Sequence, residues 1–505
     1  MRKKSALTAS SILALALALP AAFAASPAPA PYQPEPARTG PVKVGPPNGT
    51  VIAVGGGAQG PRIYKAFIDA AGGPDALILD VPNNSISGPT KTAPAWAGEG
   101  LRKNGARNVQ VLFTQSRAVA DSEAFVAIIR RAKGIWFDGG RQYRDMEAYG
   151  GTKSEREFWG VLQRGGVIGG SSAGMAVLGD FMVRGAPSNN NYIEDYPGFE
   201  KGFGYLRNTA TDMHVVARER LPDLTEVLAR YPTVLGISAD EGTAWVVQGD
   251  VAHIIGRDKA FVYGGNDPTD KGMPYLTLHP GDTYNLYTRH VVSRAADKSP
   301  VTNQFITSLF KKYSAPRLGG ATVLVAEDGD VYVDRAFGVP PQDRYMPRTT
   351  LPQFPIGDIK RVFTSLCAQL PARDAAPRGV MRPAYYSSPL DKCVSRLSTP
   401  IGMHRTAVPP GADEILSDVD ELYRLELGLQ YQSTWPKANY AAGWKVDTFD
   451  GAQRVAAYGT SGGRRAAFVR IPARRIAVII LTNDPNADAR AMSESILSKL
   501  LGSSR

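Results

Sequence analysis

The 505-residue chain has few of the residues that build metal and redox sites. It holds only two cysteines, Cys367 and Cys393, and five histidines. No cysteine and histidine cluster has the spacing of a zinc site, so we expect no metal, and no cofactor is expected either. If the chain is exported, the two cysteines could pair. The scarcity of histidine also shortens the search for a general base.

Basic patches and membrane-length apolar runs are lacking as well. The formal net charge is +11, but no basic run is interleaved with aromatic residues, so no nucleic-acid partner is expected. The positive surplus suits an acidic substrate or an envelope surface, or it has no functional meaning. The apolar run SILALALALPAAFA at 11–24 is too short to span a bilayer comfortably.

The N-terminal segment has the parts of a secretory signal peptide. A basic start, RKK at 2–4, precedes the apolar run, and AFA at 22–24 offers a small-x-small cleavage site. Residues 1–24 are therefore predicted to be a signal peptide, and residues 25–46, rich in proline and alanine, an extended linker. The protein is then expected to be periplasmic or secreted. A retained N-terminal anchor is the alternative.

Alternating apolar runs and helix-like stretches predict an α/β unit over 47–292. VIAVGGG at 51–57 and GIWFDGG at 134–140 are typical of buried strands that enter turns, with stretches such as YKAFIDAAGG between such strands. This alternation implies a parallel sheet with right-handed crossovers. TVLGISA and AWVVQGD are interpreted as two further strands of the same unit.

Residues 300–505 have strand-like runs near both ends and helix-like stretches between them, and this change of pattern predicts a separate α+β domain. An amphipathic helix is expected at 299–316, followed by a hairpin that turns at Asp328-Gly329-Asp330. A second hairpin at 465–483 and a helix at 489–501 are expected near the end. The chain shows no internal repeat.

Two serines fit the pattern G-x-S-x-G, Ser172 in GSSAG and Ser461 in GTSGG. A nucleophile elbow needs a strand before it and a helix after it, which lifts the hydroxyl out of the sheet. A strand, GVIGG, precedes Ser172, and helix-forming AGMAVLGDFM follows it, whereas a strand follows Ser461. Ser172 is therefore the predicted nucleophile, with a glycine-serine turn without chemistry as the alternative.

A serine nucleophile needs a base, and elimination favours His214. His404 belongs to the other predicted domain, His290 lies at the boundary, His279 lies in a loop, and His253 alternates within the strand VAHIIG. His214 lies inside the α/β unit in TDMHVVARER. A purely structural role is the alternative for a lone histidine.

Four motifs over about 51–290 resemble the cyanophycinase branch of the S51 serine peptidases, relatives of the alpha-aspartyl dipeptidases. The family motif G-G-[TS]-S-A-G corresponds to GGSSAG at 169–174, and F-x-G-G-[DN]-Q to FDGGRQ at 137–142. D-Q-H-F-x-x-R-x-R corresponds to DMHVVARER at 212–220, and G-I-x-x-D-E-x-T-A to GISADEGTA at 236–244.

The resemblance implies a class-I-glutamine-amidotransferase-like α/β layer that carries a serine hydrolase. Ser172 would attack and His214 would move the proton, while backbone N–H groups of Gly140 and Ala173 would form the oxyanion hole. The family places an acid a short distance past the serine, so Glu194 is named as the third catalytic residue. The implied substrate-binding residues are Gln142, Asp212, Arg218 and Arg220. A solvated helix face is the alternative for the two arginines.

The implied substrate is cyanophycin, a polyaspartate backbone with arginine on each β-carboxyl. Arginines would grip its carboxylates and acids its guanidinium groups. The chain departs from the family where Arg141 replaces an acid or amide, Met213 replaces a glutamine, and Asp223 stands where an arginine is frequent. These departures lie at substrate positions, so they bear on the polymer's identity more than on hydrolysis.

Residues 300–505 resemble the serine beta-lactamase-related, penicillin-binding-protein-like hydrolases. IGDIKRVFT at 356–364 corresponds to the family's I-G-S-x-S-K-x-F-T, with Asp358 in place of the serine and Arg361 in place of the lysine. Neither residue can supply the acylation chemistry. The domain is interpreted as truncated and catalytically inert, with contact to an envelope polymer or a partner; a homodimer stays open.

The leading hypothesis is an exported serine hydrolase that cleaves peptide or isopeptide bonds at aspartyl residues, cyanophycinase-like, with a peptide or cyanophycin-like polymer as substrate. An isoaspartyl exopeptidase without a polymer role is one alternative. A catalytically inert envelope protein that binds peptide or peptidoglycan is another. An esterase that acts through Ser461 is the third.

Overall fold

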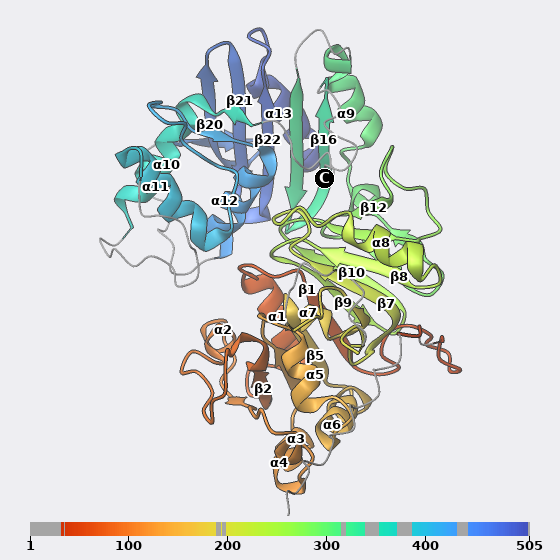
Figure 1. The fold of residues 1–505 in the computed structure, drawn as a ribbon. Helices are drawn as coiled ribbons and strands as arrows, with labels where there is room; N and C mark the ends of the chain where they lie inside the picture. The colour runs from red at the N-terminus through yellow and green to blue at the C-terminus, as the bar shows by residue number, and fades with distance from the viewer. Residues whose placement is uncertain are drawn as a thin grey trace, which may run out of the picture.

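The computed structural model shows two lobes, one below the other in Figure 1. It describes residues 32–34, 36–187, 193, 198–314, 320–338, 353–370, 386–431 and 443–502. The predicted signal peptide at 1–24 lies outside these residues. The first lobe holds the elements from β1 to β14, and the second holds those from α9 to α13. Among the helices of the described residues, none combines the length and hydropathy that crossing a membrane requires.

Parallel strands form the centre of a nine-stranded sheet in the first lobe. In their order across the sheet they are β1 (Thr50–Val54), β5 (Val167–Ser171), β4 (Gly134–Phe137), β2 (Ile78–Val81) and β3 (Val109–Val111). Four of them, all but the edge strand β3, are buried along their whole length, as expected for strands covered on both faces. The predicted parallel α/β layer is present in this part of the lobe.

Antiparallel strands extend this sheet beyond β1. They are β9 (Thr243–Gln248), β10 (Val251–Gly256), β13 (Thr283–Asn285) and β14 (His290–Ser293). The predicted parallel sheet therefore does not extend to AWVVQGD, which forms the antiparallel strand β9. Its apolar pattern predicts a buried strand, but periodicity does not specify the direction of the neighbouring strand.

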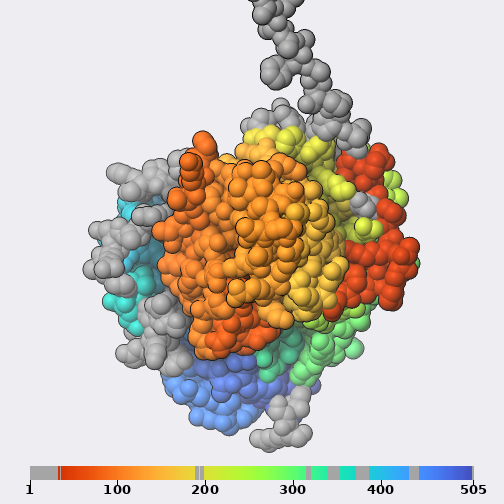
Figure 2. All heavy atoms as spheres, turned by 90° about the horizontal axis from the view of Figure 1, so that it is seen from below, coloured from red at the N-terminus to blue at the C-terminus, as the bar shows by residue number. Residues whose placement is uncertain are grey.

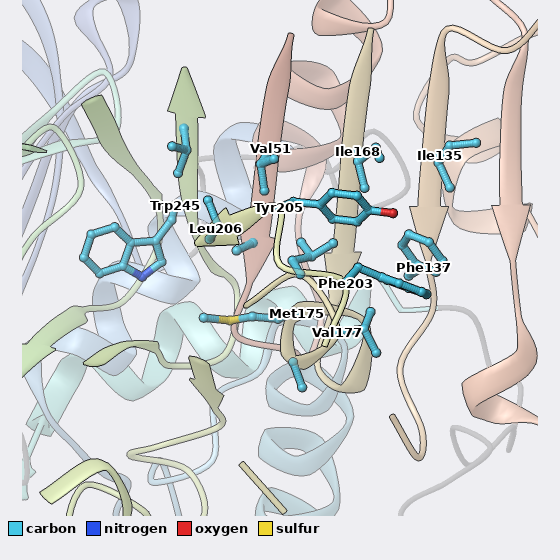
Figure 3. Close-up of a cluster of buried hydrophobic side chains, with 14 of the residues drawn as sticks. Val51, Ile135, Phe137, Ile168, Met175, Val177, Phe203, Tyr205, Leu206 and Trp245 are labelled. Carbon is cyan, nitrogen blue, oxygen red and sulfur yellow. The ribbon is translucent and has the colours of Figure 1, made fainter. Parts of the chain in front are cut away.

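Helices cover both faces of the parallel strands. They are α1 (Pro61–Ala70) and α2 (Glu99–Lys103) on one face, and α3 (Arg117–Ala120), α4 (Glu123–Ile129), α5 (Tyr143–Tyr149) and α6 (Lys153–Gln163) on the other. Figure 3 shows part of the core on the second face, where Phe137, Ile168 and Tyr205 meet. Phe203 and Phe137 rings lie 5.4 Å apart there, centroid to centroid.

A second, five-stranded sheet completes the first lobe. Its strands are β12 (Tyr275–Leu278), β11 (Ala260–Tyr263), β8 (Leu235–Ala239), β7 (Leu206–Met213) and β6 (Gly179–Met182), and α8 (Asp223–Arg230) packs on it. TVLGISA and AWVVQGD, interpreted as strands of one unit, thus lie in different sheets, as β8 and β9. The chain passes between the two sheets in the short turn at 240–242.

The second lobe is built on a six-stranded antiparallel sheet. Its strands are β16 (Asp330–Phe337), β15 (Ala321–Glu327), β22 (Ile476–Thr482), β21 (Arg464–Ile471), β20 (Ala452–Ser461) and β19 (Lys445–Phe449). The short strands β17 (Phe354–Pro355) and β18 (Leu416–Ser417) pair separately. The predicted hairpins at 328–330 and 465–483 are confirmed as β15–β16 and β21–β22.

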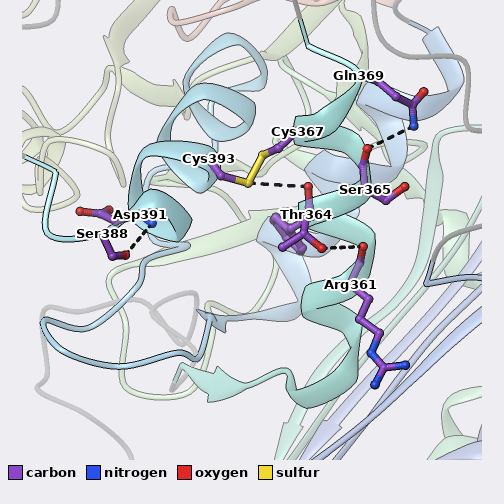
Figure 4. Close-up of a disulfide and its surroundings, with 9 residues drawn as sticks. Arg361, Thr364, Ser365, Cys367, Gln369, Ser388, Asp391 and Cys393 are labelled. Atoms are coloured by element: carbon purple, nitrogen blue, oxygen red, sulfur yellow. Dashed lines mark hydrogen bonds between the residues drawn. A yellow bond between two sulfur atoms is a disulfide. The ribbon is translucent and has the colours of Figure 1, made fainter.

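Helices also cover both faces of this sheet. On one face lie α9 (Asn303–Leu309) and α13 (Ala489–Gly502), and on the other α10 (Lys360–Ala368), α11 (Pro389–Ser398) and α12 (Val419–Tyr431). A disulfide between Cys367 and Cys393, whose Cα atoms are 5.6 Å apart, joins α10 to α11 (Figure 4). The sequence left this pairing open. The α+β architecture predicted for 300–505 is present, whereas the beta-lactamase-like classification stays a prediction.

Buried ion pairs join the two lobes. Lys259, between β10 and β11, places its Nζ atom 2.6 Å from Asp334 and 3.0 Å from Asp420 of the second lobe. Arg424 of α12 pairs with Asp258 of the first lobe. In the view from below, the first lobe in orange and yellow covers much of the second in green and blue (Figure 2). The interface therefore holds these ionised groups out of water in pairs of opposite charge.

Candidate active site

Ser172 lies at a sharp turn between β5 and the one-turn helix α7 (Ala173–Ala176). Its φ of 58° and ψ of −117° are rare for a residue with a side chain, and surrounding glycines make the turn possible. A Cβ added at Gly170 would lie 2.3 Å from the Gly174 carbonyl oxygen. Ser171, in contrast, is buried at the end of β5, and its hydroxyl accepts a 2.5 Å hydrogen bond from Gln59.

The predicted strand–turn–helix arrangement around Ser172 is therefore present, with one correction. The helix after the turn is only AGMA, because GDFM at 179–182 forms strand β6 and joins the second sheet. Ser461 has no helix after it, as predicted: β20 ends there, and β21 begins at Arg464. The hydroxyl of Ser461 contacts the carboxylate of Glu414.

His214 follows β7 and faces the Ser172 hydroxyl. Its Nε2 atom lies 2.7 Å from Ser172 Oγ, and its Nδ1 atom lies 2.7 Å from Glu241 Oε1. Gly56 makes room for the imidazole, since a Cβ there would lie 2.3 Å from His214 Cε1. The backbone N–H of His214 donates to Gly55 O at 2.9 Å. The hydroxyl, imidazole and carboxylate thus form one hydrogen-bonded series, which we call the Ser172–His214–Glu241 series.

Glu241 occupies the tip of the turn between β8 and β9. The family resemblance predicted Glu194 as the third catalytic residue, but Glu194 lies outside the residues that the structure describes. Within them, the carboxylate that meets His214 Nδ1 belongs to Glu241, a residue of the GISADEGTA motif. Sequence spacing counted forward from the serine could not find it, because β6, β7 and β8 intervene.

Burial and hydrogen bonding set the charges of this series. Burial lowers the pKa of His214 more than its hydrogen bond to Glu241 raises it, so the net shift is downward. Burial alone would raise the pKa of Glu241, but hydrogen bonds from His214 and His404 hold it well below the usual range. At neutral pH the series thus combines a neutral imidazole with an ionised carboxylate, the state that a general base requires.

The FDGG turn lies beside the serine. A Cβ added at Gly139 would lie 3.6 Å from Ser172 Oγ, which places this turn against the serine, and one at Gly140 would lie 1.9 Å from Asn84 O, so position 140 needs glycine. The backbone N–H of Ala173 belongs to the first turn of α7 and has no acceptor within that helix. The two backbone segments named for an oxyanion hole therefore meet at the serine.

Arg141 and Gln142, which follow this turn, bind protein backbone. The Gln142 amide nitrogen donates to Val183 O at 2.6 Å and to Arg184 O at 2.9 Å. The Arg141 guanidinium donates to the carbonyl oxygens of Ala186 and Pro187. Gln142, predicted to bind substrate, thus uses both amide protons to hold the segment after β6, because burial requires those protons to find acceptors.

The segment after His214 carries a cluster of charges. Asp212 is fully buried, and burial together with nearby Asp223 raises its pKa to about 8. Arg220 is half-buried and lowers that pKa through its charge, while Arg218 is exposed. Arg184 Nη2 lies 2.6 Å from Asp223 Oδ2. An arginine from the segment after β6 therefore neutralises Asp223.

A residue of the second lobe also reaches the series. His404 Nε2 lies 2.9 Å from Glu241 Oε2, the oxygen that does not face His214. On sequence alone, His404 is excluded as a candidate general base because it lies in the other predicted domain. No local pattern marks this contact, since 163 residues separate the two partners.

A serine hydrolase needs a serine hydroxyl, an imidazole and a carboxylate in hydrogen-bonded series. All three are present here, with the serine at the carboxyl end of the parallel strand β5. The family model of peptidase family S51 matches residues 51–255. The cyanophycinase of Synechococcus elongatus is 30% identical over 262 residues, 48% of this chain and 81% of the relative. The chain belongs to peptidase family S51 and is a serine-type peptidase.

Solved structures are more distant. A peptidase from an acI-B1 Actinobacterium is 22% identical with a TM-score of 0.39, covering 48% of this chain and 98% of its own. The octameric penicillin-binding protein homologue from Pyrococcus abyssi is 16% identical with a TM-score of 0.26, covering 39% of this chain and 76% of its own. Neither likeness bears on the site or classifies the second lobe.

Proposed function

We propose that the chain is an exported serine peptidase that hydrolyses peptide or isopeptide bonds at aspartyl residues of a cyanophycin-like polymer. The Ser172–His214–Glu241 series carries the proposal, because two 2.7 Å hydrogen bonds align a nucleophile, a base and an acid. The disulfide between Cys367 and Cys393 supports export, since disulfides persist in oxidising compartments.

In the proposed reaction, Ser172 Oγ attacks the scissile carbonyl carbon while His214 Nε2 takes the hydroxyl proton. Glu241 holds the Nδ1–H tautomer and stabilises the imidazolium that forms. Backbone N–H groups of Gly140 and Ala173 stabilise the oxyanion. His214 then returns the proton to the leaving amine. In the second half, His214 removes a proton from water, which attacks the acyl-enzyme carbonyl carbon. The bond from that carbon to Ser172 Oγ breaks, His214 gives the proton to Ser172 Oγ, and the carboxylate product leaves.

The polymer assignment rests on charge. Arg218 is exposed and Arg220 half-exposed directly after the base, which suits substrate carboxylates. Relatives that cover about half of this chain are cyanophycinases. The second lobe holds Asp358 and Arg361 at the beta-lactamase motif, 3.6 Å apart and exposed, and neither can act as an acylated nucleophile. Hydrolysis is thus proposed for the first lobe.

The test compares the full chain with Ser172→Ala and the matched control Ser461→Ala, on cyanophycin and on short isoaspartyl peptides. We expect Ser172→Ala to lower kcat by at least about 10³-fold, whereas Ser461→Ala leaves it unchanged. An unchanged rate in Ser172→Ala would refute the assignment. Cleavage of the peptides but not the polymer would favour the exopeptidase. No cleavage, and no fluorophosphonate labelling of Ser172, would favour a binding protein.

A further inference from the structure

One carboxylate joins two imidazoles that come from different lobes. Glu241 Oε1 meets His214 Nδ1 at 2.7 Å, and Glu241 Oε2 meets His404 Nε2 at 2.9 Å. The Glu241 side chain is 12% exposed, whereas that of His404 is 47% exposed. Because a carboxylate only accepts hydrogen bonds, His404 Nε2 must carry the proton in this contact.

The loop that carries His404 is held on both sides. Arg257 of the first lobe donates to Ile401 O at 2.7 Å, and Arg424 of α12 donates to Gly402 O at 2.8 Å. Beyond His404, the backbone N–H groups of residues 405 and 406 each donate to Glu421 Oε2 at 3.0 Å. The imidazole therefore stands on a fixed loop whose position depends on the docking of the two lobes.

A second connection reaches the other side of the base. Arg424 lies 3.8 Å from Asp240 Oδ2, in the residue next to Glu241. Asp240 Oδ1 accepts the backbone N–H groups of Val216 and Ala217 at 3.1 and 3.0 Å. These residues lie two and three positions after the base in the chain. The second lobe thus contacts both acidic residues that hold the segment of the general base.

The His404 contact has a clear physical role for the acid. Within the described residues, no other hydrogen bond to Glu241 Oε2 is present. A partly buried carboxylate with one unbonded oxygen pays a desolvation cost and can turn away from its partner. Outer hydrogen-bond partners of metal-ligating residues orient those residues in the same way, and their loss typically costs about 10- to 100-fold in metal affinity or activity, which sets the scale expected for Glu241.

We propose that His404 is a positioning residue for the catalytic acid, so that the active site of the first lobe is complete only with the second lobe docked. This inference rests on the proposed function of the Ser172–His214–Glu241 series. It assigns the second lobe a part in catalysis, although that lobe lacks a nucleophile and base at its own motif.

The experiment uses the full chain with His404→Ala, His404→Gln and the control His290→Ala, an exposed histidine paired only with Asp267 in the described residues. The rate of Ser172 labelling by a fluorophosphonate and the kcat and KM for isoaspartyl peptide are measured. We expect His404→Ala to lower kcat and the labelling rate about 10- to 100-fold with KM little changed. The glutamine amide can donate to Glu241, so His404→Gln should restore most of the rate.

Each outcome separates this inference from the proposed function. If the wild type is labelled at Ser172 and His404→Ala is labelled at the same rate, the inference about His404 is overturned and the proposed function stands. A raised KM with unchanged kcat also overturns it, since His404 would then act on substrate binding. Absent labelling of the wild type overturns the function itself. If His404→Ala fails to fold, His404→Gln decides: a folded glutamine variant that is still at least about 10-fold slower than the wild type contradicts the donor role.

Discussion

Replacing Lys259 with methionine should break a buried ionic contact between the lobes. Lys259 bonds to Asp334 and Asp420 of the second lobe, and all three side chains are about 6% exposed. Methionine matches the length of the lysine stem but removes the charge. The two aspartates then lose their shared cation and keep only more distant basic partners, His279 at 3.5 Å from Asp334 and Arg405 at 3.5 Å from Asp420.

The expected cost follows from these distances. At an effective dielectric constant of about 20, two unit charges 4 Å apart interact by about 4 kcal/mol, and breaking one partner from a buried pair typically costs about 3–5 kcal/mol. Burial and the charge of Asp334 already raise the pKa of Asp420 to about 7. Lys259 lowers this pKa through its charge, so Lys259→Met raises it further, and above about pH 7 only the variant still loses stability as pH rises. The cost of the substitution should therefore grow above about pH 7.

Urea unfolding of the full chain, followed by tryptophan fluorescence and circular dichroism, measures this cost. The matched control is Lys65→Met, since Lys65 pairs with Asp69 on the surface, where the two side chains are 73% and 58% exposed. That variant should lose less than about 0.5 kcal/mol. If Lys259→Met stays within about 1 kcal/mol of the wild type at about pH 8, the buried pairs do not hold the lobes together and the reasoning is refuted.

Three further predictions concern the active site and the disulfide. Glu241→Gln should lower kcat by about 10³- to 10⁴-fold with little change in KM, because the amide no longer selects the Nδ1–H tautomer of His214. Steady-state kinetics measure this loss, and a loss in kcat of less than about tenfold would contradict the prediction. Since burial lowers the pKa of His214 from 6.5, the acid limb of kcat/KM should lie below pH 6.5 and activity should be full at neutral pH; a limb above that value would be inconsistent. Cys367 and Cys393 are 26 residues apart, so removing the disulfide should lower the free energy of unfolding of the second lobe by about 3.5 kcal/mol. The double alanine variant should therefore unfold at a lower urea concentration than the wild type, and an equal midpoint would contradict this prediction.

Local patterns in the sequence were enough to predict Ser172 and His214. Ser172 combines a glycine pattern with an adjacent strand, and both are local properties of the chain. His214 emerged because only five histidines had to be weighed. The parallel strands within VIAVGGG, GIWFDGG and GVIGG and the hairpins of the second lobe were also predictable, since each depends on a short apolar run and a turn.

The remaining features depend on contacts between distant segments. Glu241 lies in a motif visible in the sequence, but its role follows from a turn that joins two sheets, which the apolar patterns of β8 and β9 do not reveal. Gln142 was expected to bind substrate, whereas its amide protons bind backbone after β6. His404 meets the first lobe through packing of the lobes, which no periodicity predicts.

The 163-residue separation between Glu241 and His404 has a consequence during synthesis. Ribosomes make a chain from its N-terminus, and domains generally fold as they emerge. A newly made first lobe would already hold Ser172 and His214, but Glu241 would have one imidazole partner instead of two. On the proposal made above, full activity arises only after the last part of the polypeptide has been made and has folded, which protects the cell from a peptidase that is still being translated.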